Sequence, residues 1–243
     1  MPDKTYESEH YIFHYDAGTK AEQDIAQIAA YQEACFRHIC AVLDLTPPFK
    51  IEYHLCNSPE QVGHLYGDDN PCNGFAAYPN QIYAVYNEDI QCIGFHEDAH
   101  IISDILNCLD CPAVCEGLAM YFDHRWWGIS NMDWTIFYRK TGRYIGIDKL
   151  LDEKVFYSVD CSITYPIMGA FTAWLIERYG IAAYKRTYKR QNMPDAMMEV
   201  LNKTPEELNR AFEEYIGLFT CDPVLEARME NMLSPRPRCT TIA

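Results

Sequence analysis

The first ninety residues contain segments in which the spacing of apolar residues alternates between two periods. A period of two is typical of a strand with one buried face, and a period of 3.6 is typical of a helix packed on a core. Ser58 followed by Pro59 is an N-cap with proline at the first helical position. In chain order the pattern predicts a strand over 9–15, a helix over 20–43, a strand over 49–56, a helix from Ser58 to Tyr66 and, after a turn at Pro79-Asn80, a strand from Gln81 to Tyr86.

Beyond residue 90 the helical period dominates. Residues 128–160 are rich in aromatic and turn residues and show only one short helical piece, while 234–243 contain two prolines in four residues and predict a flexible tail. We expect an α+β protein with a single domain over 1–233, made of an α/β lobe at about 1–110 and a helical lobe at about 111–233. The predicted helices contain His96 to Leu106, Glu116 to about Trp126, Ile147 to Leu151, Pro166 to Gly180, and Thr204 to about Leu218.

Two histidines four residues apart lie in the first of these helices, in the segment His96-Glu97-Asp98-Ala99-His100. Residues i and i+4 share one face of a helix, so both imidazoles can bind one metal ion, and zinc accepts nitrogen at about 2.0–2.1 Å. Glu97 follows the first histidine, where its carboxylate can reach a metal-bound water without binding the metal. The alternative is a partly exposed helix with two unrelated histidines, but the apolar helix and the strand before it favour a zinc site.

Glu116 is the expected third ligand, on the helix that follows. It stands in the segment Glu116-Gly117-Leu118-Ala119, at a helix-turn-helix distance from His100. Three protein ligands leave a fourth position for water, which is the arrangement of catalytic rather than structural zinc sites. We therefore expect one Zn²⁺ per chain, held by His96, His100 and Glu116.

Composition and charge narrow the possible partners. The 243 residues are 49% hydrophobic and 14% aromatic, which is sufficient for a sizeable core. The formal net charge is −15 and no basic stripe is present, so nucleic-acid binding is disfavoured. No stretch approaches the ~18–20 continuous apolar residues of a membrane span, and the first residues lack the apolar segment of a signal peptide. We expect a cytoplasmic protein without a membrane partner, and nothing in the sequence indicates its oligomeric state.

Eleven cysteines are a high and odd number. Because no signal peptide is seen, reduced thiols are expected rather than a disulfide framework. Cys108, Cys111 and Cys115 have C-x₂-C-x₃-C spacing, but three thiols without a fourth partner are a weak indication of a metal or cluster site. We expect free thiols here, with a local disulfide as the alternative.

The sequence resembles the gluzincin zinc metallopeptidases, the clan that includes thermolysin and the aminopeptidase-N-like enzymes. His96-Glu97-x-x-His100 with Glu116-Gly117-x-Ala119 carries the resemblance, and the order of predicted elements over 9–218 is similar to that of the compact peptidase MA-like domains. The resemblance implies a zincin-like fold with an N-terminal mixed sheet and helices, an active-site helix and a C-terminal helical lobe. It also implies Glu97 as general base.

Further site residues follow only from the resemblance. It implies a tyrosine that steadies the oxyanion, for which Tyr165 matches best and Tyr157 is second; the alternative is one more core tyrosine. It implies substrate binding along the edge strand before the metal helix, Gln81–Tyr86, which includes Tyr83. The segment Gly74-Phe75-Ala76-Ala77 stands where aminopeptidases have G-A-M-E-N, but it lacks the glutamate that holds a free amine.

One departure from the family concerns the residue that orients a ligand histidine. Thermolysin-like enzymes carry an aspartate four residues after the ligand glutamate, and Met120 occupies that position here. Asp104, one turn after His100, is the substitute that the helical spacing offers.

Three functions fit the sequence. The first is a zinc-dependent peptidase acting on a peptide or protein substrate. The second is a non-catalytic zinc-binding module that recognises a peptide or partner, and the third is a metallohydrolase of a non-peptide amide or ester. Glu97 favours a catalytic function, because a binding module has no chemical need for that carboxylate.

Overall fold

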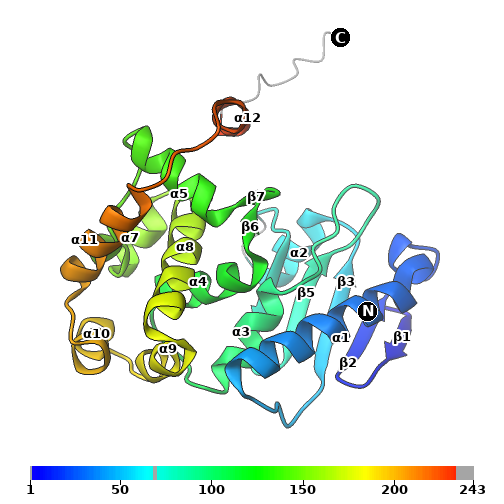
Figure 1. Cartoon of the computed structure of the whole chain (residues 1–243). Helices are drawn as coiled ribbons and strands as arrows, with labels where there is room; N and C mark the ends of the chain where they lie inside the picture. Colours follow the sequence, from blue (N-terminus) through cyan, green and yellow to red (C-terminus); the bar gives the residue numbers. More distant parts are fainter. Residues whose placement is uncertain (1, 68–69, 234–243) are drawn as a thin grey trace, which may run out of the picture.

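The computed structural model describes residues 2–67 and 70–233, which form a mixed sheet flanked by helices and a group of helices beside it (Figure 1). The predicted tail over 234–243 lies outside the described residues. The sheet half contains β1 (Lys4–Glu7), β2 (Tyr11–Tyr15), α1 (Lys20–Leu43), β3 (Ile51–Cys56), α2 (Pro59–Tyr66), β4 (Gly74–Ala77), β5 (Gln81–Val85) and α3 (His96–Asp104).

The five strands are ordered β1-β2-β3-β5-β4. The three central strands are parallel, and the outer strands β1 and β4 run antiparallel to their neighbours, which confirms the α+β class and the mixed sheet. The 24-residue helix α1 is the crossover that a parallel β2–β3 pair requires. The prediction that Gln81–Tyr86 is the edge strand is wrong. The Tyr78-Pro79 turn folds β4 back along β5, so β4 is at the edge and β5 lies inside the sheet.

Side chains of the central strands alternate between two faces of the sheet. Tyr11 and Phe13 on β2 and Tyr53 on β3 are buried with Phe36 of α1, while the residues between them are only partly buried. We call these the inner face, which α1 covers, and the outer face. α1 begins at Thr19, whose side chain accepts a hydrogen bond from the Glu22 N–H.

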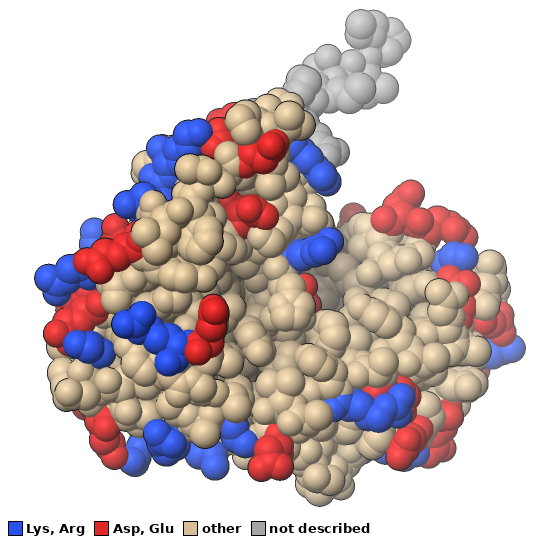
Figure 2. Space-filling model, in the orientation of Figure 1, with Lys and Arg blue, Asp and Glu red and all other residues tan. Residues whose placement is uncertain are grey.

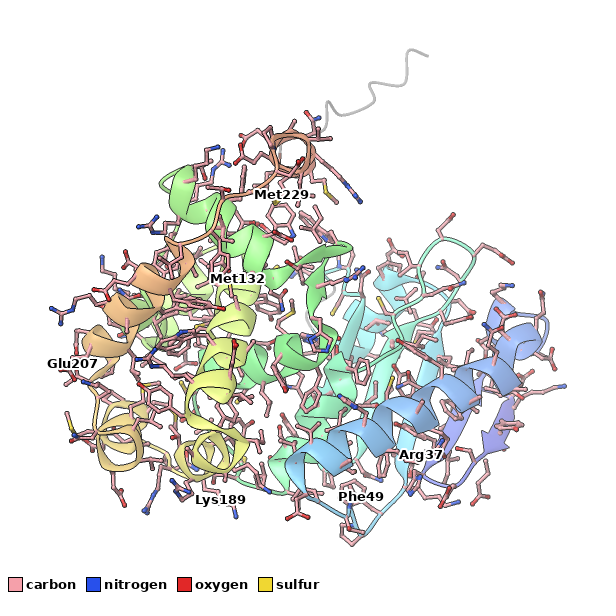
Figure 3. The ribbon with its side chains drawn as sticks, in the orientation of Figure 1. Arg37, Phe49, Met132, Lys189, Glu207 and Met229 are labelled. Atoms are coloured by element: carbon pink, nitrogen blue, oxygen red, sulfur yellow. The ribbon has the colours of Figure 1, made fainter. Side chains whose placement is uncertain are left out.

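The second half of the chain is helical and contains the β6–β7 hairpin. Its elements are α4 (Pro112–Asp123), β6 (Arg125–Trp126), β7 (Ile129–Ser130), α5 (Asn131–Lys140), α6 (Ile147–Leu150), α7 (Glu153–Ser158), α8 (Cys161–Tyr179), α9 (Ile181–Tyr188), α10 (Met193–Leu201), α11 (Pro205–Ile216) and α12 (Pro223–Leu233). One cluster of buried hydrophobic residues runs from Tyr11 of β2 to Met229 of α12 and so joins the two halves. In Figure 3, Met229 of α12 lies above Met132 of α5.

α4 packs along α8 at two glycines. A Cβ atom at Gly117 would lie 2.7 Å from Thr172 Oγ1 and 3.1 Å from the Met168 carbonyl oxygen. A Cβ atom at Gly169 on α8 would lie 2.7 Å from the Met120 Cβ. Both helices therefore approach more closely than any side chain would allow. This packing places the glutamate that precedes Gly117 at a fixed position beside α3.

The structure corrects the predictions for residues 128–166. α6 confirms the short helical piece, but α5 and α7 had no clear period in the sequence. α8 begins at Cys161 rather than at Pro166, which lies inside the helix. A proline removes one helical N–H, and its acceptor would be the Ser162 carbonyl. The Tyr138 hydroxyl donates to that carbonyl at 2.7 Å, so the helix continues through the proline.

Other sequence predictions have mixed outcomes. The helices at Lys20–Leu43 and Pro59–Tyr66 are confirmed, and α11 begins after the predicted Thr204, which forms a capping box with Glu207. β1, α9, α10 and α12 were not predicted. Among the described residues, no helix is both long and apolar enough to cross a membrane.

Candidate metal centre

The three predicted ligands come together where the two halves of the chain meet. His96 is the first residue of α3, His100 lies one turn later, and Glu116 lies in the middle of α4, which packs against α3. His96 Nε2 is 3.2 Å and His100 Nε2 is 3.5 Å from Glu116 Oε2. In Figure 1 both helices lie in the middle of the molecule.

These distances suit one tetrahedral metal ion. Two ligand atoms bound to zinc at about 2.0–2.1 Å and at a tetrahedral angle are about 3.3 Å apart, close to the 3.2 and 3.5 Å observed. Ligand atoms of all three residues lie within 4.8 Å of one another. Glu116 Oε2 is buried without a good hydrogen bond, and a cation would satisfy it. The donor set of two imidazoles and one carboxylate is one that zinc accepts in catalytic sites.

Asp123, which was not predicted as a site residue, orients His96. Its Oδ2 atom is 2.8 Å from His96 Nδ1. When Nδ1 donates its hydrogen to Asp123, Nε2 presents a lone pair towards Glu116 and the position of an ion. Asp123 follows Glu116 by seven residues, so two helical turns place both on one face of α4. That spacing was the available signal.

The suggested role of Asp104 is therefore filled by a different residue. Asp104 interacts with the Cys108 thiol, and its negative charge, followed by the hydrogen bond between them, raises the pKa of Cys108. Met120, at the family position of the orienting aspartate, is buried in the core between α4 and α8. Cys108, Cys111 and Cys115 are free thiols in the structure.

The charges of His96 and Glu116 in the centre depend on each other. Burial opposes the charged form of His96, but the neighbouring carboxylates of Asp123 and Glu116 outweigh it and raise the pKa of His96 well above its ordinary value. Burial also opposes ionisation of Glu116, but His100 and His96 hold the pKa of Glu116 well below its usual range. The site thus stabilises a carboxylate together with a positive charge, which a proton on His96 or a metal cation supplies.

Glu97 lies beside the three ligands without joining them. Burial raises the pKa of Glu97, while His96 and His100 act to lower it. Its Oε1 atom lies 3.2 Å from the place that a Cβ atom would take on Gly74 of β4. The absence of a side chain at Gly74 therefore leaves the Glu97 carboxylate room beside the edge strand.

Tyr165 of α8 also reaches the centre. Its ring stacks on that of His96, with the centroids 6.1 Å apart, and its hydroxyl interacts with Glu116. Burial and the nearby negative charge of Glu116 raise the pKa of Tyr165 far above its ordinary range, so the hydroxyl keeps its hydrogen. Trp126 of the β6–β7 hairpin contacts the Tyr165 ring from another side. Tyr157, the second candidate, is 66% exposed.

The residues suggested for substrate binding divide between the two faces of the sheet. Gly74 and Ala76 lie on the inner face, on the side of α3. Phe75 and Tyr83 are paired across β4 and β5, and their rings stack on the outer face. The backbone of β4, rather than the Tyr83 side chain, is what the fold brings to the centre. Figure 2 shows the surface hollowed between the sheet and the helical half, near the β6–β7 hairpin.

The sequence was also compared with known proteins. No protein-family model matches the chain, and no curated protein is significantly similar to it. Function is therefore inferred from the geometry of the centre. Chemically, that geometry offers a three-ligand metal site, a carboxylate beside it and a phenol that keeps its hydrogen.

Proposed function

We propose that this protein is a zinc-dependent metallopeptidase with a zincin-like fold of the gluzincin type. The observation that carries the proposal is the convergence of His96, His100 and Glu116 on one point, with Glu97 next to them and outside the ligand set. A structural zinc site would be closed by a fourth protein ligand, and the cluster provides three.

A zinc ion bound by the three ligands would polarise a peptide carbonyl and lower the pKa of a water molecule to near 7. Glu97 then accepts the proton of the attacking water and transfers it to the leaving amine. The Tyr165 hydroxyl donates a hydrogen bond to the carbonyl oxygen as negative charge develops on it. Asp123 keeps His96 in the tautomer that exposes the Nε2 lone pair.

The edge strand supports a peptide as the substrate. β4 pairs with β5 on one side, and no strand lies on its other side among residues 2–67 and 70–233. An extended peptide can add to such an edge through main-chain hydrogen bonds. Because Gly74 of β4 lies next to Glu97, a peptide added there would pass the general base. With a net charge of −15 and no basic stripe, the protein is not expected to bind nucleic acid.

The test combines metal analysis with turnover of a mixed peptide library. Wild type is compared with Glu97→Gln, and with Glu177→Gln on the exposed side of α8 as the matched control. We expect one zinc in the centre of all three proteins and cleavage that a chelator abolishes in wild type and control. Glu97→Gln should lose at least about a hundredfold in rate, the contribution of a general base.

Other outcomes select other functions. Zinc binding with peptide binding but no cleavage would select the recognition module. Cleavage of an ester or non-peptide amide alone would select the third hydrolase class. Cleavage that persists in Glu97→Gln would contradict the mechanism proposed here.

A further inference from the structure

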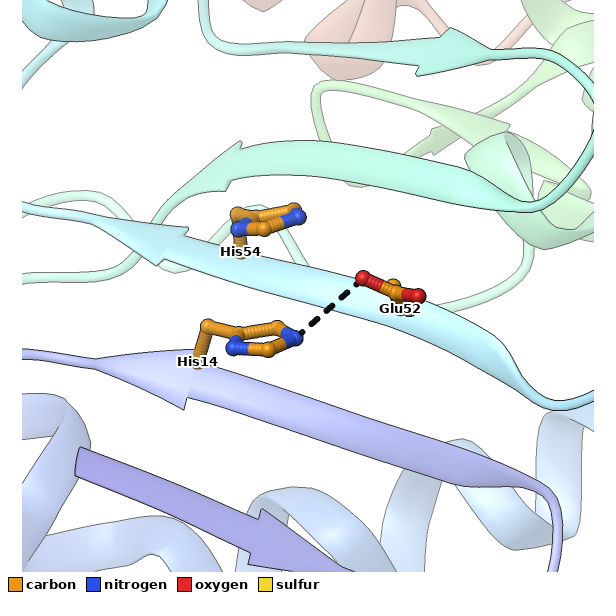
Figure 4. Close-up of side chains that lie close together, drawn as sticks. All are labelled: His14, Glu52 and His54. Atoms are coloured by element: carbon orange, nitrogen blue, oxygen red, sulfur yellow. Dashed lines mark ion pairs between the residues drawn. The ribbon is translucent and has the colours of Figure 1, made fainter. Parts of the chain in front are cut away.

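A second group of metal-binding side chains lies on the outer face of the sheet. His14 on β2 is paired in register with His54 on β3, and Glu52 precedes His54 by two residues on the same face. Figure 4 shows the three side chains together, with the ion pair between His14 and Glu52. The mechanism proposed above uses none of them.

The distances bring three ligand atoms into one small volume. His14 Nε2 is 3.5 Å from Glu52 Oε2. A ring nitrogen of each histidine and a carboxylate oxygen of Glu52 all lie within 4.8 Å of one another. The His14 and Glu52 side chains are 22% and 37% exposed, so the cluster borders solvent, and an ion can reach it once a ring turns to uncover its Nε2 atom.

Both histidines have a buried nitrogen without a hydrogen-bond partner. The Nε2 atoms of His14 and His54 are shielded from solvent and hydrogen-bonded to nothing in the described structure. A buried polar nitrogen in this state is unfavourable unless something binds it. A third cluster, around His10, differs in this respect, because the His10 ring already hydrogen-bonds Glu33 at 2.7 Å.

We propose that His14, His54 and Glu52 bind a second divalent transition-metal ion, with Zn²⁺ as the probe, on the outer face of the sheet. Two imidazoles and one carboxylate suit zinc and its neighbours in the series, whereas calcium and magnesium prefer oxygen ligands alone. Exposure of the cluster leaves further coordination positions to water.

The site is separate from the centre at His96. Side chains alternate across a strand, so Phe13 and Tyr53 point to the inner face, on which α1 packs, and His14 and His54 point away from it. An ion on the outer face is divided from the first centre by the sheet itself. The two sites can therefore be removed independently.

The two histidine rings are nearly parallel, with their centroids 4.5 Å apart. His54 also stacks on Tyr83, with the centroids 4.3 Å apart. One ion can lie in both imidazole planes only when a ring turns, and rotation of a histidine ring about its χ2 angle is soft. Zinc binding is therefore expected to turn one imidazole away from this stack.

The experiment counts zinc ions per chain after equilibration with buffered Zn²⁺. We expect two ions in wild type, one in His14→Gln/His54→Gln, one in His96→Gln/His100→Gln, and none in the combination of all four. His38→Gln, at an exposed histidine outside the three clusters, is the matched control and should retain two. Glu52→Gln keeps both imidazoles and tests the site if the double variant does not fold. It should weaken the affinity for the second zinc ion by more than about tenfold.

The outcomes separate the two proposals. Equal zinc content in wild type, His14→Gln/His54→Gln and Glu52→Gln would overturn the outer-face site and leave the proposed peptidase intact. If His14→Gln/His54→Gln removes a zinc ion and His96→Gln/His100→Gln removes none, the outer-face site is supported and the proposed peptidase is contradicted.

Discussion

Asp123 links the packing of α4 to the chemistry of His96. Its carboxylate is 2.8 Å from His96 Nδ1, on the side of the ring opposite to the nitrogen that faces Glu116. A ligand histidine held in this way keeps one tautomer and one ring orientation. Asp98, the residue after Glu97, has a comparable role in the core: it accepts hydrogen bonds from Tyr11 of β2 and Gln32 of α1. Together these two carboxylates fix the first turn of α3.

At the residue scale, Asp123→Asn should weaken zinc binding by about ten- to a hundredfold, the usual effect of removing a partner that orients a ligand histidine. The amide keeps the shape of the side chain but lowers the basicity of His96. Competition with a chromophoric chelator measures the affinity. Asp104→Asn is the control, since Asp104 contacts the Cys108 thiol, and an equal effect of both changes would show that charge alone matters.

The outer-face histidines should make stability depend on pH. Burial, and then the neighbouring His14, lower the pKa of His54 to about 4, while Glu52 acts to raise it. The unfolded chain therefore binds a proton at His54 near its ordinary pKa of about 6.5, where the folded protein does not. Protons then favour unfolding, and stability falls as the pH is lowered from about 6.5 towards 4.

This dependence is measured as the melting temperature of metal-free protein between pH 7 and pH 4.5. The melting temperature of wild type should fall further over that range than that of His54→Gln, which lacks the imidazole. His14 of β2, Glu52 of β3 and Tyr83 of β5 are the other ionisable groups against the ring. Parallel curves for the two proteins would contradict the prediction.

At the scale of elements, the α4–α8 contact determines where Glu116 lies. Gly117 permits this contact because a methyl group there would overlap Thr172 Oγ1 at 2.7 Å and crowd the Met168 carbonyl at 3.1 Å. Pro166 interrupts the hydrogen bonds of α8 without ending the helix, because Tyr138 of α5 replaces the lost donor. Both features are pairings between helices that are distant along the chain.

Gly117→Ala should therefore destabilise the protein by about 1–2 kcal/mol. Overpacking costs about 1–3 kcal/mol, and the better helix propensity of alanine returns less than about 1 kcal/mol of that. Urea unfolding measures the free energy, and the zinc affinity of the same variant reports on the position of Glu116. Thr172→Ala in the same chain should restore part of the loss, and strict additivity of the two changes would exclude the overlap as its cause.

At the scale of the whole molecule, the centre joins the two halves of the chain. α3 belongs to the sheet half and α4 to the helical half, and the proposed ion would bind both. Any ligand that binds only the folded state stabilises it, by about 2.7 kcal/mol at a hundred times its dissociation constant. Metal occupancy should therefore hold the halves together as well as serve catalysis.

Chelation should lower the melting temperature by about 5–10 °C, since 1 kcal/mol corresponds to about 2–4 °C in a protein of this size. Scanning calorimetry with and without EDTA measures the shift. The part of the shift that is due to this centre is the part that is lost in Glu116→Gln. A Glu116→Gln protein that responds to EDTA as wild type does would contradict a role of the centre in stability.

Local patterns determined much of this protein. The period of 3.6 predicted α1 from Lys20 to Leu43, and the sequence that begins at Thr204 predicted the start of α11. The i, i+4 spacing of His96 and His100 placed both imidazoles on one face, because that relation is internal to a helix. Features that depend only on contacts within one helix or strand can be predicted from the sequence in this way.

Tertiary structure decided what depends on contacts between elements. It placed β4 rather than Gln81–Val85 at the sheet edge, because only strand pairing determines which strand is outermost. It made Asp123 rather than Asp104 the partner of His96, since the packing of α4 against α3 brings the Asp123 carboxylate to the ring. It also brought His14 to His54, forty residues apart, through the register of two parallel strands. No local period contains such long-range distances, and for that reason the sequence alone does not supply them.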